Sequence, residues 1–99
     1  MLNFENGYYE GIRPEMRESL TEYELNHRLT GGFLHAALTN QFALAVIKAD
    51  KENLAAIKEY AMFFCNEIPS DCWGSKEQVR AWLTDEPSSI LRDYHANNA

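Results

Sequence analysis

Helix-breaking and helix-capping residues recur along this chain at short intervals, and they limit the length of any element between them. Proline suits the first turn of a helix, Asn, Asp and Ser cap its start, and Gly closes its end. Residues of this kind stand at Pro14, Gly31, Gly32, Asn40, Asp50, Pro69, Ser75 and Asp85. The segments between them carry apolar residues at helical spacing. The sequence therefore predicts an all-α fold, a compact single-domain bundle of five to six short helices.

These signals place the expected helices near residues 14–29, 32–39, 41–49, 51–67, 76–84 and 87–95. Gly31 or Gly32 is expected to take the left-handed conformation that ends the first helix. Asn40 and Asp50 are expected to cap the third and fourth helices. The whole chain, residues 1–99, is expected to form one helical domain. Within it, residues 1–13 should be an irregular N-terminal arm and residues 96–99 a frayed tail.

The apolar faces of these helices predict the core. We expect it to contain Leu20, Tyr23, Phe33, Leu34, Leu38, Val46, Ile47, Leu54, Ile57, Ala61, Phe64, Val79, Trp82 and Leu83. Cys65 joins the buried face of the fourth helix. Phe63 lies away from that face, so either another part of the chain covers it or it is exposed for a partner. We therefore count Phe63 as a candidate partner-binding residue.

The stretch DCWGSKEQVRAWL, residues 71–83, resembles two different kinds of site. A phosphate-binding loop needs GxxxxGK[ST] after a strand, whereas this stretch has one glycine, the order Gly-Ser-Lys and no preceding strand. A Ser-x-x-Gln capping box fits better: Ser75 accepts the N–H of Gln78, and Gln78 reaches back to the Ser75 backbone. Gly74 then provides the tight turn before the cap. We predict a capped helix with no phosphate site.

The charge of the chain narrows the class of partner. It has 15 acidic and 9 basic residues among 99, a net charge of −6. Direct binding to nucleic acid relies on clustered Lys and Arg, so this balance argues against it. An acidic surface suits a partner protein or ribonucleoprotein with a basic surface. The plain alternative is that the charge serves solubility alone.

An acidic stripe is expected on the first helix. Met16, Leu20 and Tyr23 share its apolar face, and three glutamates form a second stripe to one side of that face: Glu15, Glu18 and Glu22. We predict that this stripe binds a partner. The alternative is a solvated face near a helix N-terminus, where the helix dipole favours carboxylates.

No catalytic, metal or cofactor motif accompanies these features. The sequence lacks GxSxG and HExxH, so we expect no enzymatic activity, no metal and no cofactor. His27, His35 and a cysteine could form a metal site only through tertiary folding, and His27 fits a core or boundary position better. Cys65 and Cys72 form no CxxC pair and are expected to be free thiols in a reducing cytoplasm. We expect no signal peptide at the N-terminus and no membrane span, because the longest apolar run, residues 42–47, is too short to cross a bilayer.

Several runs of the sequence together resemble a family of small proteins from bacteriophages and prophages of Gram-negative bacteria. These runs are MRESLTEY, GGFLHAALTN, the Ala-Asp at 49 and 50 with Asn53, NEIP, and WGSKEQVRAWL; they span about residues 16–83. The chain departs from the pattern at Gln41, where an acidic residue is expected after the Asn. Small acidic phage proteins often act by binding one host machine and blocking it, as anti-CRISPR and anti-restriction proteins do. The resemblance therefore implies a non-enzymatic binding role in the host cytoplasm.

Two functions from different classes follow. The first is an inhibitor that binds a host nucleic-acid-handling defence complex through its acidic surface. The second is a phage-housekeeping regulator or adaptor that forms a homodimer through surplus aromatic residues, namely Phe4, Tyr8, Tyr9 and Phe63.

Overall fold

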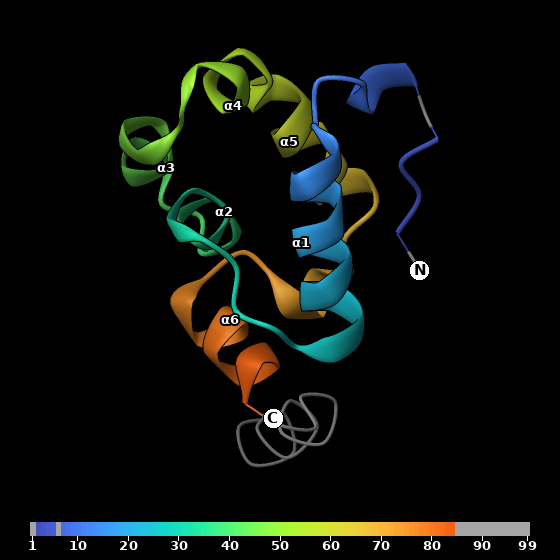
Figure 1. Ribbon diagram of the computed structural model, residues 1–99. Helices are drawn as coiled ribbons and strands as arrows, with labels where there is room; N and C mark the ends of the chain where they lie inside the picture. The colour runs from blue at the N-terminus through green and yellow to red at the C-terminus, as the bar shows by residue number, and fades with distance from the viewer. Residues whose placement is uncertain (1, 6, 85–99) are drawn as a thin grey trace.

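The computed structural model describes residues 2–5 and 7–84, and over these ranges the chain is helical with no strand (Figure 1). Its elements in order are η1 (Gly7–Tyr9), α1 (Pro14–Asn26), α2 (Gly32–Leu38), α3 (Phe42–Lys48), α4 (Lys51–Ala55), α5 (Ile57–Asn66), η2 (Ser70–Cys72) and α6 (Lys76–Leu83). The all-α prediction is confirmed. The predicted helix at 87–95 and the predicted frayed tail lie outside the described residues.

The first helix ends three residues earlier than predicted. His27 takes the left-handed conformation, with φ 56° and ψ 37°, and its N–H donates to the Tyr23 carbonyl at 3.1 Å. Gly31, by contrast, has φ −71° and precedes α2 in an extended conformation. The expectation that Gly31 or Gly32 ends α1 is therefore wrong, because a left-handed histidine satisfies the last carbonyls first.

The junction of α2 and α3 also differs from its prediction. Asn40 takes φ 61°, its N–H donates to Ala37 at 3.1 Å, and the N–H of Gln41 donates to Ala36 at 2.9 Å. This pair of bonds is the Schellman arrangement that closes a helix, and Asn is one of the few residues that tolerates it without strain. Asn40 therefore ends α2 and does not cap α3, whose start has no side-chain cap.

The predicted helix 51–67 is two helices. Asp50 caps the first as expected, its side chain accepting the Asn53 N–H at 2.8 Å. Ala56 then leaves the helical region, with φ −99° and ψ 13°, so that the helix is interrupted there and α5 begins at Ile57. The break accompanies a buried side-chain bond from the Tyr60 hydroxyl to Asn53 Oδ1 at 2.6 Å. Nothing in the local sequence announces this break, because Ala favours a continuous helix.

The core confirms only part of the predicted list. Seven of the expected residues are buried: Leu20, Tyr23, Phe33, Leu34, Leu38, Phe64 and Val79. Val46, Ile57, Trp82 and Leu83 are partly buried, whereas Ile47, Leu54 and Ala61 are exposed. The buried face of α5 consists of Tyr60, Phe63 and Phe64, one residue out of register from the prediction, and this rotation also exposes Cys65.

The N-terminal arm explains that rotation. The Phe4 ring stacks on Phe63 with centroids 4.5 Å apart, and the Tyr9 ring meets Phe63 edge-on at 5.0 Å. Phe63 is 0% exposed. The prediction of an exposed, partner-binding Phe63 is therefore wrong, because the arm covers this ring. This contact within the chain involves Phe4, Tyr9 and Phe63. These three rings are therefore not available to form the interface of a homodimer.

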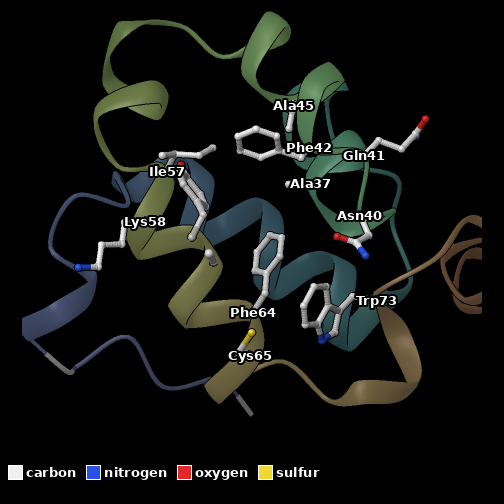
Figure 2. Close-up of a pocket in the computed structure, with 12 residues that line it drawn as sticks. Ala37, Asn40, Gln41, Phe42, Ala45, Ile57, Lys58, Phe64, Cys65 and Trp73 are labelled. Atoms are coloured by element: carbon white, nitrogen blue, oxygen red, sulfur yellow. The ribbon is translucent and has the colours of Figure 1, made fainter.

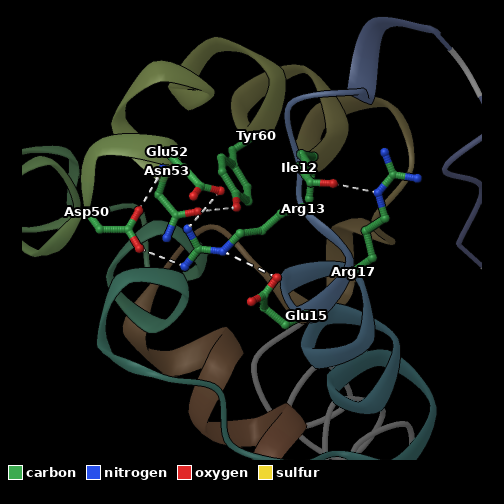
Figure 3. A network of polar contacts seen from close by, with 8 residues as sticks. All are labelled: Ile12, Arg13, Glu15, Arg17, Asp50, Glu52, Asn53 and Tyr60. Atoms are coloured by element: carbon green, nitrogen blue, oxygen red, sulfur yellow. Dashed lines mark hydrogen bonds and ion pairs between the residues drawn. The ribbon is translucent and has the colours of Figure 1, made fainter.

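Two arginines fasten the arm to the helices (Figure 3). Arg17 donates to the carbonyls of Ile12 at 2.6 Å and Tyr9 at 2.9 Å. Arg13 lies between α1 and α4, where it bonds Asp50 at 2.7 Å and forms further ion pairs with Glu15 and Glu52. The hydrogen bond from Arg13 lowers the pKa of Asp50, and the Asn53 N–H acts in the same direction.

The turn before α6 confirms the cap prediction. Ser75 Oγ accepts the Gln78 N–H at 3.1 Å, and Gly74 takes φ +112°. The side chain of Gln78 differs from the expected box, since it bonds the Ser75 hydroxyl at 3.1 Å and the Ser70 carbonyl at 2.9 Å. The Gly74 N–H also donates to the Leu38 carbonyl at 2.7 Å, which ties the start of α6 to the end of α2.

Truncating Phe63 tests the role of the arm. We expect Phe63→Ala to lower the free energy of unfolding by about 3–5 kcal/mol, because it empties the space between the arm and α5. Urea denaturation measures this loss. The matched control is Leu29→Ala, since Leu29 is a large apolar residue that is mostly exposed. Its effect should stay within about 0.5 kcal/mol. Equal losses in the two variants would contradict the arm's role.

Candidate interaction surface

Helix α3 carries the most exposed apolar side chains of the described chain. Phe42 is 73% exposed, Ile47 77% and Leu44 37%, and Ala45 is the only fully buried residue of this helix. It packs mainly against α2, with which it forms a helical hairpin at the edge of the molecule (Figure 1). None of the helices within the described ranges has the length and apolar character needed to cross a bilayer. We call Leu44 and Ile47 the outer face of α3.

An apolar groove lies between α3 and α5. It encloses about 430 Å³, and Ala45, Ile57, Phe64 and Trp73 are among the residues that line it. The ring of Phe42 points across this groove toward Ile57 (Figure 2). The walls are almost entirely apolar, and open clefts of this size and character are common at binding sites in proteins.

A basic cleft adjoins the groove. It encloses about 280 Å³ between α2 and α6, and its cationic residues are Lys76 and Arg80, with His35 on the opposite wall. Gln41 lines both the groove and the cleft. Neither Lys76 nor Arg80 forms an ion pair with any residue in the described part of the chain. The cleft therefore places two positive charges, which have no ion-pair partner among residues 2–5 and 7–84, beside an apolar surface.

The acidic stripe of α1 is partly neutralised. Glu15 lies 3.6 Å from Arg13, and Glu22 lies 3.5 Å from Arg28 and accepts a hydrogen bond from Asn26. Glu18 is exposed and has no ion-pair partner within the described ranges. Two of the three carboxylates thus have local partners, and a basic ligand would compete with these arginines. In the view of Figure 1, α2 lies between α3 and α1, the helix that carries the stripe.

The histidines occupy boundary positions. The His27 ring packs against the Trp82 ring with centroids 4.7 Å apart, which agrees with the expected boundary role. His35 lines the basic cleft. No group of three His, Cys, Asp or Glu residues in the described part of the chain is arranged to hold a metal ion.

The two cysteines differ in environment. Cys65 is exposed on α5 and lines the groove, whereas Cys72 is buried in η2. Burial raises the pKa of the Cys72 thiol to about 12, with Glu24 and Asp71 acting in the same direction. The carbonyl of Cys72 accepts the Tyr23 hydroxyl at 2.5 Å, and the Tyr23 carbonyl accepts Trp82 Nε1 at 2.7 Å. Cys72 therefore belongs to the junction that holds α1, η2 and α6 together.

Thiol chemistry should separate the two cysteines. At pH 8 we expect DTNB to modify Cys65 in the folded protein and Cys72 only after unfolding. The physical reason is that Cys72 is inaccessible and its pKa lies about four units above this pH, so its thiolate is almost absent. Peptide mapping after a short exposure identifies the modified residue, and urea-unfolded protein is the control. Rapid native modification of Cys72 would contradict this placement.

Comparison with known proteins identified no relative of this chain. No family model, no curated protein and no solved structure matches the chain.

Proposed function

We propose that this protein works by binding another protein, without catalysis, and that the outer face of α3 is the centre of the contact. The exposure of Ile47 and Leu44 on a helix that has only one fully buried residue is the observation that carries the proposal. Large apolar side chains contribute about 1.5–3 kcal/mol each when they are fully buried. In the described fold, Ile47 is mostly exposed and contributes little of this burial free energy. Binding to a partner surface would bury the side chain and provide that stabilisation.

The partner that the sequence favours is a host nucleic-acid-handling defence complex with a basic surface. The net charge of −6 and the resemblance to small phage proteins support this choice. Glu18 would contribute at the rim, because it is exposed and has no ion-pair partner in the described ranges. A rim charge acts mainly on the association rate and its salt dependence. We propose inhibition of that complex, in the host cytoplasm, as the consequence of binding.

A homodimer is the second candidate, and the same exposed helix favours it. Two copies could place their α3 helices against each other in a two-fold arrangement, with Ile47 meeting its own counterpart. A self-contact of this kind would suit a phage-housekeeping regulator or adaptor. The mass in solution distinguishes the two candidates, since an inhibitor of a host complex needs no second copy.

The test compares two variants of α3. Leu44→Ser/Ile47→Ser removes both apolar contacts of the outer face, whereas Ala43→Ser makes a small polar change at another exposed position of the same helix. We expect the wild type and Ala43→Ser to retain the same host complex from a bacterial lysate, and the double variant to lose at least about tenfold in affinity for it, since two contacts are removed. Equal retention by all three proteins would contradict the proposed surface.

The acidic stripe has its own test. Reversing Glu15, Glu18 and Glu22 to Lys should slow association with the purified complex and reduce the salt dependence of the rate, because a steering field is removed. The fold should remain intact, which a circular dichroism spectrum checks. Unchanged association kinetics at low and high salt would show that the stripe is only a solvated face.

A further inference from the structure

The residues that line the groove and the adjoining cleft differ in charge from the chain as a whole. The chain has 15 acidic and 9 basic residues. Among the described residues, however, no Asp or Glu lines either cavity, whereas Lys58 lines the groove, and Lys76 and Arg80 line the cleft. These three cations form no ion pair with residues 2–5 or 7–84. This surface therefore favours a negatively charged ligand, in contrast to the acidic stripe of α1.

The cations stand on both sides of the apolar groove. In the view of Figure 2, Lys58 and Trp73 lie at opposite ends of the groove. Trp73 comes shortly before α6, the helix that carries Lys76 and Arg80, and Gln41 lines both cavities. A ligand in the groove thus has one positive charge near one end and two more beyond the other.

The middle of the groove offers an aromatic contact. Phe42 is 73% exposed, although its ring points across the groove toward Ile57 (Figure 2). The groove encloses about 430 Å³, which lies within the range of about 300–1,000 Å³ that is typical of ligand sites. Aromatic rings that become buried on binding often contribute most of the binding free energy. An apolar side chain of a ligand would cover the Phe42 ring here.

Two carboxamides favour a peptide over a hydrocarbon chain in this site. Asn40 and Gln41 both line the groove. The Gln41 amide donates to Thr39 Oγ1 at 2.8 Å, and its side-chain carbonyl accepts no hydrogen bond from the described residues. The side chain of Asn40 is exposed and likewise has no hydrogen bond within the described ranges. Carboxamides of this kind can donate to and accept from a peptide backbone, whereas a hydrocarbon chain would leave them without partners.

We propose that the groove and the cleft together bind an acidic segment of a second partner protein, with a pair of large apolar side chains in the groove and carboxylates on the cations. Arg80 can bind a carboxylate through two parallel hydrogen bonds, and Lys58 and Lys76 act as point charges. This inference goes beyond the proposed function and does not rest on it, because it uses a different surface and the opposite sign of charge.

A designed peptide tests the site. The probe is a short blocked peptide in which two aspartates precede and two aspartates follow a Leu-Phe pair, and isothermal titration calorimetry measures its affinity for the full-length protein. We expect saturable binding that is at least about tenfold tighter than that of two control peptides. One control has lysines in place of the aspartates, and the other has serines in place of Leu-Phe. Equal affinity for the three peptides, or no binding of the probe, would overturn the proposal.

The contribution of the cleft is tested by charge reversal. Lys76→Glu/Arg80→Glu should weaken binding of the probe at least about tenfold, because two attractive charges become repulsive. The matched control, Lys48→Glu/Lys51→Glu, changes the net charge by the same amount at exposed positions that line neither cavity. It should lose less than about threefold, and circular dichroism checks that both variants are folded. Equal losses would overturn the proposal by showing a general effect of charge.

Cys65 places the probe in the groove, because its exposed thiol lines that cavity. A saturating concentration of the probe should slow the alkylation of Cys65 by iodoacetamide about threefold or more in the folded protein. The same concentration should have little effect on Lys76→Glu/Arg80→Glu, which binds the probe weakly. Unchanged alkylation of the wild type with the probe bound would overturn the placement.

Further measurements separate this site from the outer face of α3 and from other anionic ligands. Leu44→Ser/Ile47→Ser should bind the probe with wild-type affinity, since these residues do not line the groove. Loss of the host complex and loss of the probe are therefore independent results. Decanoate and a short oligothymidylate are the alternative ligands. If either protects Cys65 and the peptide does not, the proposal is overturned and the site binds a lipid or a nucleic acid.

Discussion

Burial of Phe63 beneath the N-terminal arm is the contact on which the rest of the fold depends. The ring lies between Phe4 and Tyr9, and it directs the aromatic face of α5 toward the arm. Arg17 then holds the arm by its carbonyls and also lies over the Phe4 ring, with its guanidinium carbon 5.4 Å from the centroid. A small domain buries a smaller fraction of its surface than a large one, so few large side chains can lie in its core. This one concentrates Tyr60, Phe63 and Phe64 on one face of α5.

Because the large aromatic residues of the core lie on α5, helix α3 lies at the edge of the core. The hairpin with α2 holds it in place through Ala45, and the Schellman closure at Asn40 sets the direction in which it leaves. Its larger side chains consequently face the groove or the solvent. Exposed apolar residues of this kind promote aggregation. In soluble proteins, large exposed apolar patches commonly mark a site that binds another molecule. The net negative charge of the chain opposes uncontrolled association.

The features predicted correctly from the sequence are those that depend on neighbouring residues alone. The caps at Asp50 and Ser75 formed as expected, because a short polar side chain next to a helix start needs no tertiary information. The interior face of α5 was missed because it depends on a contact between residues far apart in the sequence, from Phe4 to Phe63. The break at Ala56 was missed for a similar reason, since the accompanying Tyr60–Asn53 bond is a packing feature that local propensity does not encode. The exposure of α3 was not predicted, because the apolar run FALAVI is typical of a core helix. Only the positions of the neighbouring helices show which of its side chains remain exposed.

The stability of the Leu44→Ser/Ile47→Ser variant tests the central claim most directly, namely that the outer face of α3 is surplus to the fold and available for contact. Chemical denaturation gives the free energy of unfolding for the variant and the wild type. If the outer face is surplus, the double variant loses no more than about 1 kcal/mol, because Ile47 is mostly exposed and Leu44 is only partly covered in the fold. A loss of about 2 kcal/mol or more, typical of buried apolar residues, would show that these side chains support the core and would contradict the account.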